Sequence, residues 1–127
     1  MKYKILVIED DAPLCYLLGR ILRSRFDVDI QNDPISAMGW LSLGNLPNLI
    51  LCDFDLPGVN GLDFIQNIKQ SGVYSQIPLV MLSGTSDKKV IDQCLAAGAS
   101  EFLGKPFDPS ELIESISKVL KSDETYA

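Results

Sequence analysis

Short apolar runs alternate along this chain with longer segments that place apolar residues at helical spacing. Such an alternation predicts a parallel sheet whose strands are joined by right-handed helical crossovers. The first, third and fourth runs are apolar throughout, which is typical of strands covered by helices on both faces. The second run alternates apolar and polar residues and indicates an edge strand. The expected strands cover about residues 4–8, 26–30, 49–52, 79–82 and 101–103.

Capping residues mark where the helices begin and end. Asp11 and Asp33 are expected to cap the first two helices, since an Asp side chain accepts hydrogen bonds from free N–H groups of the first turn. The second helix is expected to run towards Gly44, and Gly98 to end the fourth, because glycine suits the residue after a helix. Asp108 opens the last helix in a close variant of a capping box. The third and fourth helices are expected over residues 62–70 and about 87–97.

The length of 127 residues and the hydrophobic content of 46% fit one domain with its own core. We expect this domain to cover residues 1–121 and a polar tail that frays to cover residues 122–127. The apolar runs fall far short of the roughly 18 residues of a membrane span. No signal-peptide pattern precedes the first strand. These features predict a cytoplasmic protein that does not enter a membrane.

Charge and residue usage exclude several kinds of site. The formal net charge is −6 and no cluster of Lys or Arg stands out, which argues against direct nucleic-acid binding by this domain. Histidine is absent, so His-based triads and His-ligated metals are excluded. Cys15, Cys52 and Cys94 lie on predicted apolar faces and are expected to be reduced core residues. The composition does not exclude a bound divalent cation, since clustered carboxylates attract such ions.

Reactive side chains follow four of the five predicted strands. Glu9 and Asp10 follow the first, Asp53 the third, Ser83 the fourth and Lys105 the last. Since the carboxyl ends of parallel strands meet at one edge of the sheet, we expect these groups to converge. Clustered carboxylates repel each other unless a cation compensates, and Mg²⁺ suits a site with few carboxylates and room for water. A carboxylate nucleophile beside Mg²⁺, a lysine and a hydroxyl predicts phosphoryl transfer.

Each of these residues also has a simpler interpretation. Asp10 could have no role beyond capping the first helix, and Asp53 could be a solvated residue at the start of a loop. Ser83 could be an ordinary hydroxyl at the end of a strand, and Lys105 a surface lysine. Phe102 could serve only in core packing, as most strand aromatics do. The convergence of the carboxylates, the hydroxyl and the ammonium at one edge favours a common site.

In order and position, these motifs resemble the receiver domain of two-component response regulators, whose best-known member is the bacterial chemotaxis regulator. The resemblance covers about residues 4–121. The family pattern has an acidic pair, a phospho-accepting Asp, a Pro-Gly-x-x-Gly loop, a Ser or Thr, and a Lys-Pro pair with an aromatic residue before it. The matching residues are Glu9, Asp10, Asp53, Pro57, Gly58, Gly61, Ser83, Phe102, Lys105 and Pro106.

The resemblance implies a flavodoxin-like, doubly wound α/β fold with five parallel strands in the order 2-1-3-4-5 and helices on both faces. It implies that Asp53 accepts the phosphoryl group, and that Ser83, Lys105 and Phe102 act in catalysis or switching. It implies that Mg²⁺ is held by Asp10, Asp53 and the backbone carbonyl of Asp55, with Glu9 acting through water. It also implies a cis peptide bond between Lys105 and Pro106, and a structural loop formed by Pro57, Gly58 and Gly61.

The resemblance further implies a signalling role and not that of a free-standing turnover enzyme. A phosphohistidine of a sensor histidine kinase or phosphotransfer protein would supply the phosphoryl group. The response would pass to an effector domain or protein through the surface of the fourth helix, fifth strand and fifth helix, and the phosphorylated form would be able to dimerise. This chain departs from the commoner family pattern in having Glu9 for Asp, Ser83 for Thr, Gly84 for Ala and Phe102 for Tyr.

Two other functions remain open at the level of sequence. Asp53-Phe54-Asp55 resembles the Asp-x-Asp of haloacid-dehalogenase-type phosphatases, although Glu9 and Asp10 lie upstream of it whereas that family's further acids lie downstream. Catalytic turnover of a phosphomonoester would identify the chain as a phosphatase of that type. A flavodoxin-like binding module shares the strand alternation, but acids follow the first strand here and would repel a flavin phosphate.

Overall fold

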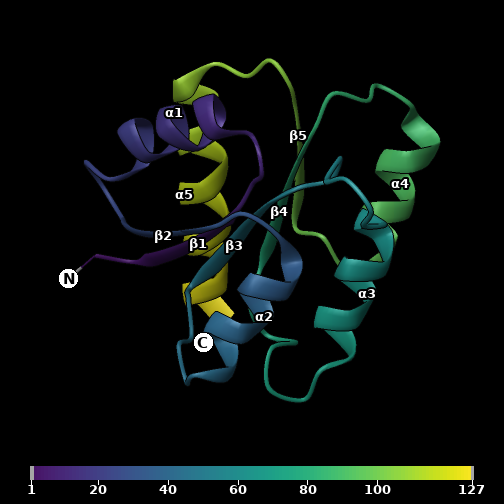
Figure 1. Ribbon diagram of the computed structural model, residues 1–127, viewed down its shortest axis with the longest axis horizontal. Coiled ribbons are helices and arrows are strands. Elements are labelled where there is room, and N and C mark those ends of the chain that lie inside the picture. The colour runs from purple at the N-terminus through teal and green to yellow at the C-terminus, as the bar shows by residue number, and fades with distance from the viewer. Residues whose placement is uncertain (1, 127) are drawn as a thin grey trace.

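A five-stranded sheet lies between two layers of helices (Figure 1). The structure is a computed structural model that describes residues 2–126, with side chains described for residues 2–122. The strands are β1 (Lys4–Ile8), β2 (Asp27–Gln31), β3 (Leu49–Asp53), β4 (Leu79–Ser83) and β5 (Glu101–Gly104). The helices are α1 (Ala12–Leu22), α2 (Pro34–Ser42), α3 (Gly61–Gln70), α4 (Lys88–Ala97) and α5 (Pro109–Tyr126).

The strands are all parallel and follow the order β2-β1-β3-β4-β5. This order confirms the predicted doubly wound sheet and places β2 at an edge, as its alternating sequence indicates. The chain reverses its direction across the sheet after β2, so β1 and β3 are the neighbours on either side of the switch point. In sheets of this kind, ligands bind beyond the carboxyl ends of the strands at that point.

Alternate residues of each central strand pack against different helices. On β1, Ile5 and Val7 join the core beneath α1 and α5, whereas Leu6 and Ile8 join the core beneath α2, α3 and α4. Figure 1 shows α1 close to α5 and α3 close to α4, and these helix pairs are in contact. The central strands are apolar throughout because both of their faces are buried. Close packing on both faces holds the ends of these strands in place under the loops.

Most helix ends agree with the capping residues. The Asp11 side chain accepts from Leu14 N–H, and the Asp33 side chain accepts from Ser36 N–H. Gly44, with a φ of +94°, follows the C-cap Leu43 of α2 and ends that helix as predicted. Several other boundaries differ by one residue, as for β2, which covers Asp27–Gln31. The last helix continues to Tyr126, so the segment predicted as a polar tail is helical up to that residue.

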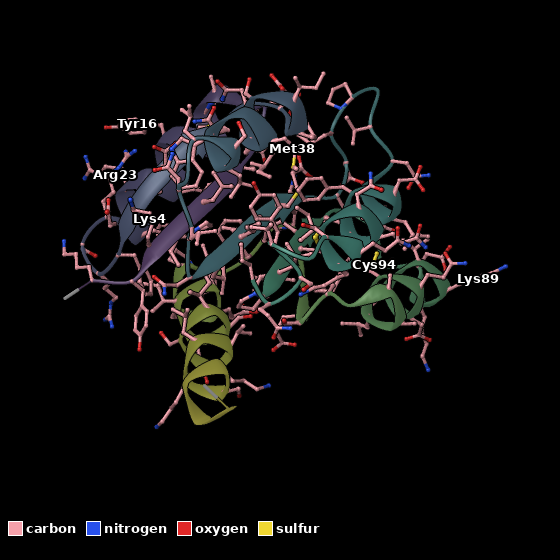
Figure 2. The ribbon with its side chains drawn as sticks, turned by 90° about the horizontal axis from the view of Figure 1, so that it is seen from below. Lys4, Tyr16, Arg23, Met38, Lys89 and Cys94 are labelled. Carbon is pink, nitrogen blue, oxygen red and sulfur yellow. The ribbon has the colours of Figure 1, made fainter. Side chains whose placement is uncertain are left out.

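The three cysteines form no disulfide, and two of them lie in the core as expected. Cys52 and Cys94 are buried, but Cys15 is only partly buried. The Cys15 thiol sits near the surface end of the core, where it donates to the backbone carbonyl of Glu9 at 3.2 Å. In Figure 2, Cys94 lies on the inner side of α4, whereas Lys89 of the same helix projects away from the protein. Among the described residues, the helices are too short or too polar to cross a membrane.

Candidate functional site

Three carboxylates meet at the carboxyl ends of β1 and β3. Parallel pairing aligns Ile8 with Cys52, so Glu9 and Asp53, which follow these residues, lie beside each other. One carboxylate oxygen from each of Glu9, Asp10 and Asp53 lies within 4.8 Å of the other two. Glu9 and Asp53 are buried, and Asp10 is exposed. The predicted convergence of these acids is therefore present in the folded chain.

Lys105 brings a positive charge to the two buried acids. Its Nζ atom lies 3.0 Å from Oδ1 of Asp53 and 3.7 Å from Oε1 of Glu9. Burial opposes the charged form, but the hydrogen bond to Asp53 and the charges of both acids raise the pKa of Lys105 above its ordinary value. The Lys105–Pro106 peptide bond is cis, and Lys105 N–H donates to the carbonyl of Ser83 at 2.7 Å. These contacts direct the lysine from the end of β5 across the site.

Glu9 is held at the bottom of the cluster, with an exposed fraction of only 1%. Its Oε2 atom accepts from the backbone N–H groups of Asp10 at 3.0 Å and Asp11 at 3.1 Å. Its Oε1 atom has no hydrogen-bond partner among the described residues. Burial raises the pKa of Glu9 to about 7, the charge of Asp53 adds to the increase, and the Asp11 N–H and Lys105 oppose it. The cluster thus places three neighbouring carboxyl groups around Lys105.

This donor set fits a hard divalent cation. Such cations prefer oxygen ligands, and the three neighbouring carboxylates supply them. A cation would also compensate the repulsion between Glu9 and Asp53 and give the buried Oε1 of Glu9 a water or metal partner. The structure thus shows residues that could hold a metal ion at the switch point of the sheet.

The loop after β3 is shaped by backbone contacts and two glycines. Asp55 N–H donates to Oδ1 of Asp53 at 2.9 Å, which fixes the orientation of that carboxylate. Gly58 has a φ of +70°, in the left-handed region that glycine adopts without steric cost. A Cβ atom on Gly61 would lie 2.5 Å from the Phe54 ring and 2.9 Å from the Phe54 carbonyl. Gly61 therefore lets α3 begin directly against the loop that carries the acid.

Ser83 is fully buried at the end of β4, and its hydroxyl is turned towards the loop after β3. The hydroxyl donates to Oδ2 of Asp55 at 2.9 Å, and the N–H of Gly84 donates to the same oxygen at 3.1 Å. The family resemblance implies only the backbone carbonyl of Asp55 as part of the site, so this role of its carboxylate was not predicted. Its position two residues after Asp53 was the only available signal, because the partners come from another strand.

Phe102 packs against Phe54, another residue that the sequence analysis did not single out as part of the site. The two ring centroids are 6.1 Å apart, and the planes are tilted by 58°. Both rings are partly buried and lie against the core beneath α2, α3 and α4. Core packing thus accounts for the position of Phe102, and it joins β5 to the residue that follows Asp53.

Comparison with known proteins agrees with this geometry. The family model for the response regulator receiver domain matches residues 5–117. This chain belongs to the response regulator receiver domain family. The assignment decides against the phosphatase and flavodoxin-like alternatives, because the family model matches nearly the whole chain.

Two curated response regulators are similar to this chain. The phosphate regulon transcriptional regulatory protein PhoB of Escherichia coli is 34% identical over 122 residues, which are 95% of this chain and 53% of PhoB. The DNA-binding response regulator MtrA of Mycobacterium tuberculosis is 33% identical over 126 residues, which are 98% of this chain and 53% of MtrA. The chain thus spans about half the length of these curated relatives.

A solved receiver domain has the same fold. The signal receiver domain of a signal transduction histidine kinase from Syntrophus aciditrophicus superposes with a TM-score of 0.84 at 26% sequence identity. The match covers 94% of this chain and 91% of that chain. The proteins similar to this chain thus include a transcriptional regulator and the receiver domain of a histidine kinase.

Proposed function

We propose that this receiver domain accepts a phosphoryl group on Asp53 from a phosphohistidine of a sensor histidine kinase or phosphotransfer protein. The observation that carries the proposal is the Asp53 carboxylate, held 3.0 Å from the Lys105 ammonium beside the carboxylates of Glu9 and Asp10. Oδ1 of Asp53 accepts from Lys105 and from Asp55 N–H, so we expect Oδ2 to be the attacking oxygen.

Mg²⁺ is the cation that we expect at the carboxylate cluster. Asp10, Asp53 and the backbone carbonyl of Asp55 would hold it directly, and Glu9 would act through water. Few protein carboxylates with room for water suit Mg²⁺ better than a cation that needs a full protein cage. When bound, Mg²⁺ would neutralise charge on the oxygens of the transferred phosphoryl group.

The transfer exchanges one bond to phosphorus for another. An oxygen of Asp53 forms a bond to phosphorus while the bond from phosphorus to the donor imidazole nitrogen breaks, and the nitrogen keeps the electron pair. Lys105 pairs with a phosphoryl oxygen, and the Ser83 hydroxyl donates to another. Water later attacks the phosphorus and releases phosphate from Asp53. The domain therefore promotes its own phosphorylation and dephosphorylation and does not turn over an external substrate.

The output of the proposed reaction is a change of shape. Movement of Ser83 towards the phosphoryl group would open space that Phe102 could occupy, and this would alter the surface of α4, β5 and α5. That surface would contact an effector domain or protein, or a second phosphorylated copy. The relatives PhoB and MtrA are named as a transcriptional regulator and a DNA-binding regulator, so an output domain of that kind is one candidate. With a net charge of −6, this domain would leave DNA contact to such a partner.

The organisation of the chain follows from the same proposal. Residues 1–121 would form the receiver domain, and residues 122–127 would be a polar C-terminal tail. Kinase, receiver and effector would meet in the cytoplasm.

Acetyl phosphate, a small phosphoryl donor, tests the proposal directly. With Mg²⁺ present, intact-mass spectra should show one added phosphoryl group, and acetate is released. Asp53→Asn should abolish the addition, because an amide is a far poorer nucleophile than a carboxylate. Asp63→Asn is the matched control, since Asp63 is an exposed acid in the first turn of α3 outside the cluster. Undiminished phosphorylation of the Asp53→Asn protein would refute the assignment.

A further inference from the structure

The Asp55 carboxylate joins two loops that border the site. Its Oδ2 atom accepts from the Ser83 hydroxyl at 2.9 Å and from the Gly84 N–H at 3.1 Å. Asp55 is exposed in the loop after β3, whereas Ser83 is fully buried at the end of β4. One carboxylate oxygen therefore fixes the β4–α4 loop relative to the loop that carries the acid.

The Ser83 hydroxyl has little freedom in this arrangement. A serine hydroxyl has one proton, so it donates to one acceptor at a time. That proton goes to Asp55, and the same Ser83 oxygen accepts from Thr85 N–H at 3.1 Å. The oxygens of a phosphoryl group on Asp53 would compete for this hydroxyl and for the neighbouring Gly84 N–H, because they are strong hydrogen-bond acceptors. In the unphosphorylated protein, the carboxylate of Asp55 occupies both donors.

We propose that the Asp55 side chain is a positioning residue that holds Ser83 and Gly84 in the unphosphorylated arrangement, and that phosphorylation at Asp53 breaks both of its hydrogen bonds. This inference rests on the proposed function and deepens it. The role is separate from that of the Asp55 backbone carbonyl, which every substitution of the side chain leaves in place. In the unphosphorylated protein, Asp55 thereby lowers the population of the arrangement that the phosphorylated protein adopts.

Because Asp55 is exposed, its hydrogen bonds to Ser83 and Gly84 are weak enough to be broken. A phosphoryl group carries more charge than a carboxylate and three acceptor oxygens, so it competes well for the same donors. A charge-assisted hydrogen bond of ordinary strength changes an equilibrium by about tenfold. Removing the Asp55 carboxylate should therefore favour the phosphorylated arrangement by about that factor.

Beryllofluoride, which mimics a phosphoryl group on an aspartate, provides the probe. In the presence of Mg²⁺, Asp55→Ala should bind beryllofluoride about tenfold more tightly than the natural sequence. Asp55→Asn keeps an acceptor oxygen without the charge and should fall between the two. The same Asp55→Ala substitution made together with Ser83→Ala separates the hydrogen bonds from simple charge. If the gain in beryllofluoride affinity comes from the lost charge alone, Asp55→Ala gives the same gain in the Ser83→Ala background. If the gain comes from release of Ser83, it is smaller in that background.

The unliganded protein gives a second readout. In Asp55→Ala, the Gly84 amide proton should shift upfield and exchange faster with solvent, because its acceptor is gone. An unchanged Gly84 amide, or an equal affinity gain with and without the Ser83 hydroxyl, would overturn the positioning role. If the natural sequence binds beryllofluoride but the Asp55 variants bind it equally, only the positioning role fails. If the natural sequence does not bind it at all, the proposed function fails and the role of Asp55 with it.

Discussion

The Lys105 ammonium lies 3.0 Å from Oδ1 of Asp53, so the residue after β5 partly neutralises the acid that ends β3. Glu9 shares the same ammonium at 3.7 Å. Only 5% of Asp53 and 1% of Glu9 are exposed, so neither charge is well screened by water. This single lysine is therefore important for stability as well as for the proposed chemistry.

Replacing Lys105 by Ala should lower the free energy of unfolding by about 2 kcal/mol without metal, because two buried carboxylates lose their countercharge. Mg²⁺ should restore part of that loss by taking over the neutralisation. Urea unfolding with EDTA and with Mg²⁺ measures both effects. Lys118→Ala is the control, since Lys118 pairs with Glu101 at the surface and should cost less than about 0.5 kcal/mol. Equal losses in the two variants would contradict the structural role of Lys105.

Replacing Asp10 by Asn should weaken Mg²⁺ binding by about tenfold, roughly 1.4 kcal/mol, because a charged ligand is removed. Amide NMR titration of the residues after β1 and β3 measures the affinity. Asp11→Asn is the matched control, because Asp11 caps α1 through Leu14 N–H and Asn fulfils that role equally well. If the two variants bind Mg²⁺ alike, Asp10 is not a ligand.

Replacing Gly61 by Ala should destabilise the protein by about 2 kcal/mol, because the new methyl group would overlap the Phe54 ring and approach its carbonyl. Thermal or urea unfolding measures the change. Gly39→Ala, at an exposed position of α2 with no atom near the new methyl group, should instead stabilise by up to about 1 kcal/mol. A neutral Gly61→Ala would show that the loop after β3 can move away from α3 at little cost.

Replacing Ser83 by Ala should leave phosphorylation of Asp53 intact but reduce the response of residues 87–105. The hydroxyl is the donor expected to move towards the phosphoryl group, and its loss removes the pull on the β4–α4 loop. Amide chemical shifts with and without beryllofluoride measure the response. Because the driving energy is only a difference in phosphate contacts, a population shift is expected. Shifts confined to the pocket in the natural sequence would leave the proposed switch without support.

Replacing Asp108 by Ala should destabilise the start of α5 in a pH-dependent way. The Ser110 N–H and hydroxyl both donate to the Asp108 carboxylate and lower its pKa from the ordinary value of 3.8. A folded-state pKa below the unfolded one stabilises the protein above the unfolded pKa, and the contribution is lost as the pH falls through the folded pKa. The two proteins should therefore differ most at neutral pH and converge in strong acid. Urea unfolding over this pH range measures the difference, and a constant difference would exclude the carboxylate as its source.

The sequence alone predicted the fold and the location of the site. Short apolar runs bounded by turn residues predict central strands of a helix-covered sheet, and helical crossovers between them favour parallel pairing. The carboxyl ends of such strands share one edge, so Glu9, Asp53, Ser83 and Lys105 had to come near one another. Helix caps such as Asp11 were readable because they depend on residues only three positions away.

Only the tertiary structure decided which of these groups contact each other. The Asp55 carboxylate holds Ser83 and Gly84, and Phe102 packs on Phe54, through contacts between different strands and loops. The burial that raises the pKa of Glu9 to about 7 likewise depends on how closely the neighbouring elements pack. The sequence pattern fixes which strand end a residue occupies, but side-chain direction and burial depend on the register and packing of the whole sheet. That is why the convergence of these side chains was predictable and their hydrogen-bond partners were not.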